Sequence, residues 1–347
     1  MNFLTRIFFL MIMGFFVLSC GKKTIEEADK PQIIKAKYPS DVIANFTQWK
    51  ILLGNGERSD SLENYERKGF FYTAFDETNW VVYKTPNRGV TSKTSHNTRT
   101  ELGEKKRWIP EDGGKLNGTL KVKHVSTTGD ARVAASYSVV VGQIHSDEGH
   151  ENEPLKIFYK KFPGHRKGSV FWTYEINTEG DNSGRWDFST SVWGYDMSVV
   201  GPEPNVNPAE PEEGIKLGEE FSYEVNVYEG IMYLTFKSEG HKTKTFTKNL
   251  KVSEFVRKAD IPEQVLTLYR VLGRDGTERT TAYAGELQYF KQGAYNQTNG
   301  DDPSKNMVWS TGSETYEGDL EKQYANGSYT EVWFLASSIG PGTAPVD

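Results

Sequence analysis

The chain has 347 residues, of which 36% are hydrophobic and 25% are charged, and its formal net charge is −6 at pH 7. A chain of this length can bury a large core, and its single cysteine excludes an internal disulfide. The acidic balance disfavours nucleic acid as a partner, so any polyanionic ligand must meet a locally basic surface.

Residues 1–19 have the pattern of an export signal. Arg6 precedes the apolar run Ile7–Leu18, which is too short to span a membrane comfortably. The run leads into Val17–Cys20, which resembles the lipobox of bacterial lipoproteins, where the signal is cut before a cysteine that then carries lipid. We therefore predict a lipoprotein signal peptide, a lipid on Cys20 and attachment to the bacterial outer membrane or cell surface. An ordinary secretory signal with a chance cysteine is the alternative.

Residues 20–40 are rich in Lys, Glu, Ala and Pro and are expected to form a tether between the lipid and a folded domain. No internal repeat or linker divides residues 41–347, which we interpret as a single domain. Short stretches rich in Val, Tyr, Phe, Thr and Trp recur there between Gly, Asn, Asp and Pro. Helical periodicity is scarce, with short helices or turns expected only at Asp41–Leu53 and Val252–Lys258.

The strand-like stretches favour an all-β sandwich or jelly roll over a parallel α/β fold. The expected strands are Leu116–Val125, Ala134–His145, Leu155–Phe162, Ser169–Asn177, Phe221–Tyr228, Ile231–Lys237, Lys242–Leu250, Gln264–Leu272, Gly285–Gln297 and Thr330–Ala336.

The longest interruption between these strands is Thr178–Gly218, which is expected to be a loop. Loops of this length are usually functional or disordered. This one carries Trp186, Trp193 and Tyr195, which suit stacking on sugar rings or, equally, packing within the loop itself.

Two segments place polar side chains together on one face of a strand, because alternate residues of a strand face the same side. Arg99 and Glu101 share a face in the first segment, and Gln143 and His145 share a face in the second, with Ile144 opposite. The planar fork of arginine suits a carboxylate. Taken alone, a surface ion pair and a structural histidine are the alternatives.

A third segment gathers four polar side chains on one strand face, while Gly293 leaves room for a close-lying chain. Those four residues are Tyr289, Lys291, Tyr295 and Gln297. A solvent-facing strand is the alternative.

Together, the three segments resemble the alginate lyases of polysaccharide lyase family 7. That family is marked by Arg-x-Glu-Leu-Arg, Gln-Ile/Val-His and Tyr-Phe-Lys-x-Gly-x-Tyr-x-Gln segments in this order. The resemblance runs from about Asn45 to Leu335, and Gly103 stands where the family has its second arginine. The matching segments are Trp49–Leu53 for the opening strand, Arg99–Gly103, Gln143–His145 and Tyr289–Gln297.

The resemblance implies a β-jelly roll, a concanavalin-like sandwich of two antiparallel sheets with a concave substrate groove. It also implies cleavage of alginate, a 1,4-linked uronate polymer, by β-elimination, a reaction that requires neither a metal nor a cofactor. The implied catalytic residues are Arg99 and Gln143 to neutralise the carboxylate, His145 as base and Tyr295 as proton donor. The implied substrate-binding residues are Glu101, Tyr289, Lys291 and Gln297.

Stereochemistry decides how many groups the elimination needs. In guluronate the C5 proton and the C4 oxygen lie on opposite faces of the sugar, so two residues are needed, His145 as base and Tyr295 as acid. In mannuronate they lie on the same face, and Tyr295 could serve as both base and acid. Ile144 resembles family members that accept guluronate, and we expect a modest preference for that sugar. We also lean towards exolytic cleavage in a partly closed site, although a mobile lid over an open groove fits equally well.

A basic run, Leu155–Thr173, follows His145 and contains no acidic residue. We predict that Lys160 and Arg166 bind the polyanion, although a solvated hairpin is the usual fate of such a run. The acidic segment Asp147–Glu153 lies even nearer to His145 and must turn away, bind a cation or close one end of the groove.

Two other functions compete with a lyase. Glu317–Glu321 matches the Glu-x-Asp-x-Glu signature of some β-jelly-roll glycoside hydrolases, but its Gly- and Ser-rich surroundings favour a loop. A non-catalytic lipoprotein that binds acidic glycans on the same fold is the rival of another class, which the presence of His145 and Tyr295 argues against. The histidines fit no strong zinc pattern, and a monomer is the default expectation.

Overall fold

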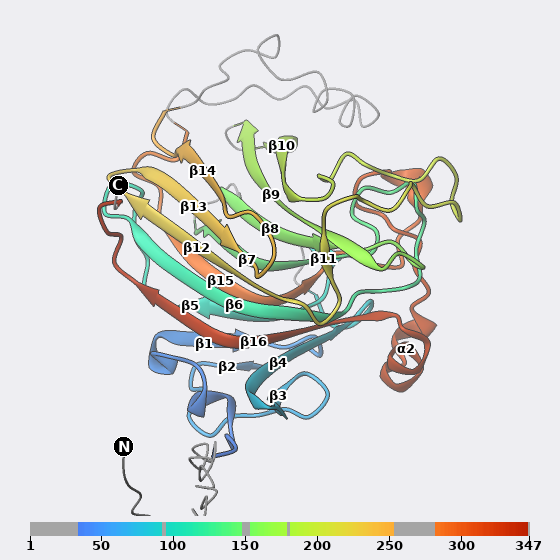
Figure 1. The fold of residues 1–347 in the computed structure, drawn as a ribbon, viewed down its shortest axis with the longest axis horizontal. Helices are drawn as coiled ribbons and strands as arrows, with labels where there is room; N and C mark the ends of the chain where they lie inside the picture. Colours follow the sequence, from blue (N-terminus) through green and yellow to red (C-terminus); the bar gives the residue numbers. More distant parts are fainter. Residues whose placement is uncertain (1–33, 92–94, 148–152, 179–180, 253–281, 346–347) are drawn as a thin grey trace, which may run out of the picture. The chain divides into compact units, whose positions relative to one another are not determined.

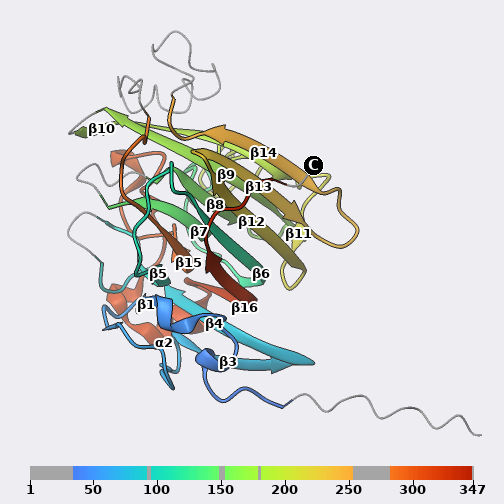
Figure 2. The same cartoon turned by 90° about the vertical axis from the view of Figure 1, so that its left-hand side faces the viewer.

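Two antiparallel β-sheets pack face to face in the computed structural model, which describes residues 34–91, 95–147, 153–178, 181–252 and 282–345. Residues 35–347 form one compact unit. Figures 1 and 2 show the sheets as two curved layers with the loops gathered at their ends. The two-sheet sandwich expected from the sequence is therefore confirmed.

The first sheet has the strand order β10-β9-β8-β7-β15-β5-β1-β2, and β11 pairs with β9. Its strands are β1 (Trp49–Leu52), β2 (Arg58–Ser59), β5 (Arg99–Glu104), β7 (Ser138–Ser146), β8 (Leu155–Lys160), β9 (Lys167–Thr178), β10 (Asp181–Trp193), β11 (Ile215–Lys216) and β15 (Gln288–Asn296).

The second sheet has the order β14-β13-β12-β6-β16-β4-β3. Its strands are β3 (Phe71–Asp76), β4 (Thr78–Pro86), β6 (Gly114–His124), β12 (Glu220–Tyr228), β13 (Ile231–Lys237), β14 (Lys244–Asn249) and β16 (Tyr329–Gly340).

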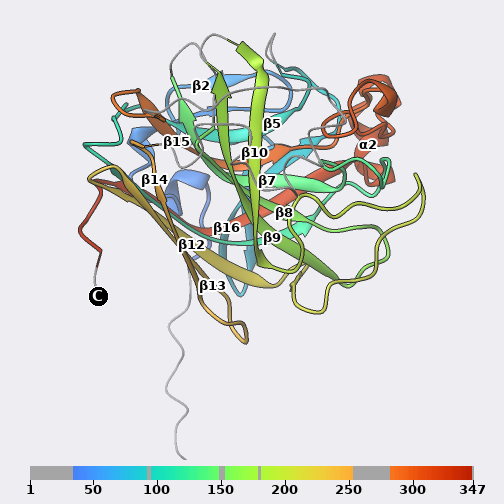
Figure 3. The ribbon, with the colours of Figure 1, turned by 90° about the horizontal axis from the view of Figure 1, so that it is seen from above.

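Helical structure in the described residues is short. It comprises α2 (Leu320–Asn326) and the 3-10 turns η1 (Pro39–Asp41), η2 (Phe46–Gln48), η4 (Pro303–Lys305) and η5 (Tyr316–Gly318). Figure 3 shows α2 at one side of the domain, away from β14. No helix within these residues is long and apolar enough to cross a membrane.

The hydrophobic core lies between the two sheets, and strand alternation decides which side chains enter it. Leu102 of β5, Ile144 of β7 and Phe290 of β15 are completely buried there. Their neighbours along each strand therefore point out of the opposite face of the first sheet. This outer face is where the three polar sequence segments meet.

A β-bulge in β7 sets which residues reach that outer face. Val140 joins a small apolar cluster outside the main core, whereas Val141 packs in the main core and Gly142 faces the second sheet. The register between β7 and β8 shifts at this point. The bulge returns Gln143 to the outer face and Ile144 to the core, as bulges beside functional sites often re-aim side chains.

The short helices or turns expected at Asp41–Leu53 are present as two 3-10 turns, which lead into β1, the expected opening strand, whose burial alternates along Trp49–Leu52. Other sequence expectations about elements are wrong. The expected loop Thr178–Gly218 begins with strand β10, which pairs with β9 despite its Asp, Asn, Ser and Gly content. Strands β3 and β4 and helix α2 were not anticipated. Gln264–Leu272 lies outside the described residues, as does all of Val252–Lys258 except Val252.

Glu317–Glu321 contains no strand. It runs from η5 into the start of α2, where the Asp319 side chain caps the helix by accepting a hydrogen bond from the Lys322 N–H. The paired carboxylates on one strand face that a jelly-roll hydrolase needs are therefore missing from this segment.

Candidate active site

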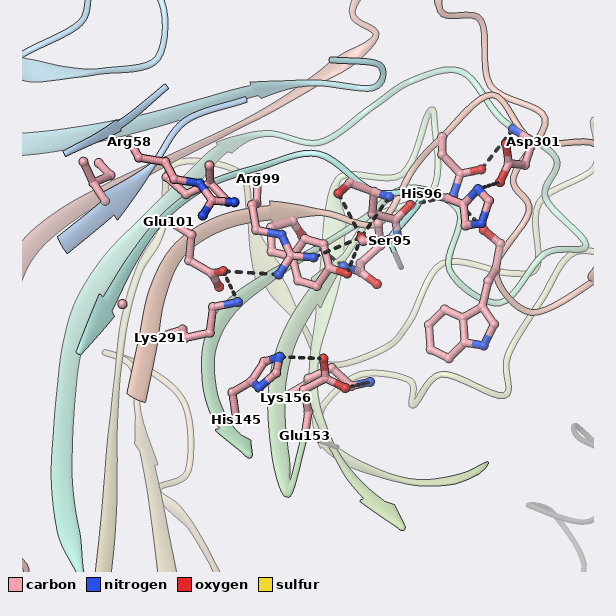
Figure 4. Close-up of a pocket in the computed structure, with 18 of the residues that line it drawn as sticks. Arg58, Ser95, His96, Arg99, Glu101, His145, Glu153, Lys156, Lys291 and Asp301 are labelled. Atoms are coloured by element: carbon pink, nitrogen blue, oxygen red, sulfur yellow. Dashed lines mark hydrogen bonds and ion pairs between the residues drawn. The ribbon is translucent and has the colours of Figure 1, made fainter. Parts of the chain in front are cut away.

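A cavity of about 900 Å³ opens on the outer face of the first sheet. Strands β1, β5, β7 and β15 supply its floor, and residues 95–97 and 299–310 line it from neighbouring loops. Figure 4 shows Arg58 at one end, His96 and Asp301 at the other, and Arg99 between them. The cavity thus brings together residues that lie far apart in the sequence.

Arg99 and Tyr295 face each other across directly paired positions of β5 and β15. The guanidinium carbon of Arg99 lies 3.8 Å from the centre of the Tyr295 ring, and its Nη2 donates to Ser95 Oγ at 3.0 Å. The Tyr295 hydroxyl lies 3.3 Å from the same Ser95 oxygen. Ser95 therefore links the expected carboxylate-binding group to the expected proton donor.

Glu101 organises the middle of the floor. One of its carboxylate oxygens accepts a hydrogen bond from the Gln143 side-chain amide, and the other lies 2.9 Å from Lys291 Nζ. Glu101 and Gln143 are almost completely buried. Gln143 therefore orients Glu101, which itself lines the cavity. The expected contacts of these two residues with substrate stay predictions.

His145 is held in one tautomer. Its Nδ1 lies 2.6 Å from the Ser146 carbonyl oxygen, which can only accept a hydrogen bond, so Nδ1 carries the proton and Nε2 holds the free lone pair. Burial, together with the nearby charge of Lys291, lowers the pKa of His145 to about 4. The imidazole is therefore neutral near pH 7, as a general base must be.

Glu153 approaches the free nitrogen of His145. Its Oε1 lies 3.6 Å from His145 Nε2, and its Oε2 lies 3.5 Å from Lys156 Nζ. Lys156 is anchored in turn by Glu175 at 2.6 Å. Of the two described residues of the acidic segment, Glu153 lies at the site, whereas Asp147 turns away to pair with Arg107 at 2.7 Å.

Tyr289 and Gln297 complete the third polar segment. The Tyr289 ring lies 5.2 Å from the His145 ring and stacks under the Arg107 guanidinium at 3.9 Å. Burial raises the pKa of Tyr289 to about 12, so this phenol stays protonated. Gln297 lines the cavity and donates to the Tyr295 carbonyl oxygen at 3.3 Å.

Lys160 and Arg166 do not line the cavity, contrary to the prediction. Lys160 is buried because it belongs to β8, where its ammonium donates to the carbonyl oxygens of Ala134 and Val199. Arg166 is 86% exposed and pairs with Glu210 on a distant loop. Of the basic run, Lys156 reaches the cavity, because it is the lysine of β8 directly opposite Gln143.

The aromatic residues of Thr178–Gly218 serve packing where their side chains are described. Trp193 is buried in the main core beside Phe221. The Tyr195 hydroxyl donates to the Ala209 carbonyl oxygen at 3.0 Å. Stacking on sugars is therefore wrong for Trp193, and the Trp186 side chain lies outside the described part.

Sequence reasoning missed several residues that line the cavity. Ser95 and the ion pair of His96 with Asp301, at 2.9 Å, come from loops whose meeting no local pattern reveals. Lys50 and Arg58 come from β1 and β2, and the alternation of β1 was the signal that could have found Lys50. Among the described residues, no group of three or more His, Cys, Asp or Glu side chains is placed to hold a metal ion.

Residues 44–339 match the protein family described as alginate lyase. This chain belongs to that family. It is therefore a polysaccharide lyase, and the resemblance of its three polar segments to alginate lyases is confirmed.

Two relatives with solved structures extend this result. The structure is similar to that of the exolytic PL7 alginate lyase AlyA5 from Zobellia galactanivorans, with a TM-score of 0.89 and 70% identity over 90% of this chain and 100% of that one. The alginate lyase from Klebsiella pneumoniae shares the fold, with a TM-score of 0.61 and 22% identity over 88% of this chain and 99% of that one. The β-jelly roll is therefore confirmed.

A curated alginate lyase from Klebsiella pneumoniae is also similar in sequence. It is 29% identical over 262 residues, which span 67% of this chain and 72% of the relative.

Proposed function

We propose that this alginate lyase cleaves its polymer by β-elimination in the cavity around Arg99, His145 and Tyr295. The observation that carries the proposal is the fixed tautomer of His145, whose unprotonated Nε2 faces a cavity that also holds an arginine and a tyrosine hydroxyl. The elimination needs a base, a group that neutralises the carboxylate and a proton donor, and these three groups can supply them.

In the proposed reaction, Arg99 binds the carboxylate of the reacting sugar, and charge spreads into that carboxylate as C5 loses its proton. His145 Nε2 takes the C5 proton, the C4–O bond breaks, and a C4=C5 double bond forms. Tyr295 gives its hydroxyl proton to the departing glycosidic oxygen. Lys291, held by Glu101, lines the same cavity and supplies a further hydrogen-bond donor to the carboxylate.

The first experiment follows ultraviolet absorbance during incubation of the purified protein with alginate. Elimination leaves a double bond conjugated to the carboxylate, which hydrolysis does not produce. A rising signal supports the lyase. Binding without any rise would favour the non-catalytic glycan-binding protein.

We further propose that cleavage is exolytic and prefers guluronate. The similar alginate lyase from Zobellia galactanivorans is exolytic. In the present structure the ion pair of His96 with Asp301 lies at one end of the cavity, where it would help to close that end. His145 and Tyr295 are two separate candidate groups for base and acid in one cavity, as elimination across opposite faces of guluronate requires. Separate digests of polyguluronate and polymannuronate test the preference, and release of only short products from the start of digestion tests the exolytic mode.

The lipid on Cys20 and attachment to the outer membrane or cell surface also stay proposals, supported by the Val17–Cys20 pattern. Cys20→Ser is expected to move the protein from the membrane fraction to the soluble fraction of the producing cells. Unchanged membrane association of that variant would overturn lipid anchoring at Cys20. Size-exclusion chromatography tests the expected monomer.

A further inference from the structure

Gly103 interrupts the row of charged side chains on the polar outer face of the first sheet. Gly103 lies on the outer face of β5, paired with Lys291 on one side and Lys50 on the other. A Cβ atom at this position would meet nothing closer than Lys50 Cε at 3.6 Å, Lys50 Cγ at 3.7 Å and Tyr289 Cε2 at 3.9 Å. The backbone therefore does not demand glycine, and the Lys50 side chain lies across the space above it.

The Lys50 ammonium makes no hydrogen bond or ion pair within the described part of the chain, in contrast to Lys291 and Lys156, which are both bound by carboxylates. The nearby carboxylate of Asp147, whose pKa the charge of Lys50 helps to lower, is already paired with Arg107. Arg58, on the neighbouring strand β2, lines the same cavity and is equally unpaired among those residues. Cations without a partner on a cavity wall are available to an anionic ligand.

The strand order places these two cations to one side of the reacting groups. His145 lies on β7, Tyr295 on β15 and Arg99 on β5, while Lys50 and Arg58 follow on β1 and β2. His145 and Lys50 are three strands apart, or about 14 Å at the backbone. Figure 4 shows the Arg58 guanidinium directed towards Arg99 from this side.

We propose that Lys50, with Arg58 beside it, binds the carboxylate of a uronate that flanks the sugar being cleaved. Lys50 is thus a substrate-binding residue, whose ammonium reaches the polar outer face of the sheet over Gly103. The inference rests on the proposed lyase function for its substrate class and on the geometry around Gly103 for its location.

The test compares Lys50→Met with Lys50→Arg and with Lys237→Met, which removes one exposed lysine from the far sheet and so controls for net charge. Initial rates are measured on uronate oligomers of defined length. We expect KM to rise about tenfold in Lys50→Met, the effect of losing one charge-assisted hydrogen bond, with kcat within about twofold. Lys50→Arg should retain most of the affinity. The loss should be larger for a tetramer than for the shortest oligomer cleaved.

A second variant tests whether Lys50 and position 103 are equivalent. Adding Gly103→Arg to Lys50→Met returns a cation to the same space from β5, and KM should fall back towards the wild-type value. A KM unchanged from that of Lys237→Met would overturn the proposal. A collapse of kcat in Lys50→Met would also overturn it, because Lys50 would then serve the reacting carboxylate.

Failure of the proposed lyase function is recognised separately, because the wild-type protein would then produce no ultraviolet signal. The proposal for Lys50 is still tested in that case through the dissociation constants of the same oligomers, measured by calorimetry. A larger Kd for Lys50→Met than for Lys237→Met supports the anion site, and equal Kd values for the two variants reject it.

Discussion

The guanidinium carbon of Arg99 lies 3.8 Å from the centre of the Tyr295 ring, at positions paired directly across β5 and β15. This contact joins the group proposed to bind the carboxylate to the group proposed to protonate the leaving oxygen. The aromatic ring holds the arginine by cation–π attraction, and the hydroxyl is left to act on the substrate. The two functions of Tyr295 can therefore be separated.

Tyr295→Phe removes the hydroxyl and keeps the ring beneath Arg99. We expect kcat to fall by about 10²–10⁴-fold, the usual contribution of a positioned proton donor, while KM changes little. The free energy of unfolding should drop by less than about 1 kcal/mol, because the bond lost is the 3.3 Å contact with Ser95. Ultraviolet assays and urea unfolding measure both, with Tyr233→Phe on the far sheet as control. A variant that retains full kcat would remove Tyr295 from the mechanism.

The acid limb of the pH–rate profile should report His145. The imidazole must be neutral to accept the C5 proton, and burial together with Lys291 lowers its pKa to about 4. Activity should therefore persist as the pH falls below 6.5, where an ordinary histidine becomes protonated, and should decline only as the pH approaches about 4. The profile of kcat/KM, which reflects the free enzyme, checks this. A decline centred near pH 6.5 would show that His145 is not held as the structure indicates.

Glu101 and Lys291 form a buried ion pair, and removing the charge of one partner alone should lower the free energy of unfolding. Glu101→Gln leaves the Lys291 ammonium without its counter-charge, and we expect about 3 kcal/mol of destabilisation. Glu101→Gln with Lys291→Met removes both charges and should be less destabilised than Glu101→Gln alone. Urea unfolding of the two single variants and the double variant completes the cycle. Strict additivity would mean that the two side chains do not depend on each other.

Gly293 is needed for the approach of β15 to β5. It has a φ of +150°, and a Cβ atom there would lie 2.5 Å from the Thr100 carbonyl oxygen, which as backbone cannot move aside cheaply. Gly293→Ala should cost about 2–4 kcal/mol, from overpacking and backbone strain combined. It should also lower kcat, because Tyr295 lies two residues further along.

Gly240→Ala is the matched control for that substitution. Gly240 has a φ of +76° with nothing near the added atom, so it should cost only about 1 kcal/mol of backbone strain. Thermal unfolding and the ultraviolet assay distinguish the two variants. Equal losses would show that the close approach to Thr100 does not matter.

Local pattern predicted most of the sheet strands and the outward face of the site. Gln143 and His145 alternate with Ile144, and the burial of Ile144 confirms the orientation that the period of two requires. Alternation of apolar and polar residues did not predict β10, because its polar sequence shows no such alternation. A strand of this kind is stabilised by pairing with a neighbour, here β9, which the local sequence does not reveal.

The sequence by itself determined the class of fold and the family, because these depend on strand periodicity and on short motifs within single strands. Only the tertiary structure decided which charges are used. Lys160 and Arg166 belong to the same basic run as Lys156, yet only Lys156 faces the cavity.

Lys50 is a cavity residue that the local sequence did not reveal. It lies 53 residues before Gly103 in the chain, but antiparallel pairing of β1 with β5 places its side chain over that glycine. Whether a charged side chain is free or neutralised depends on partners brought from distant strands and loops. Pairing between strands sets those partners, and no local pattern in the sequence records them.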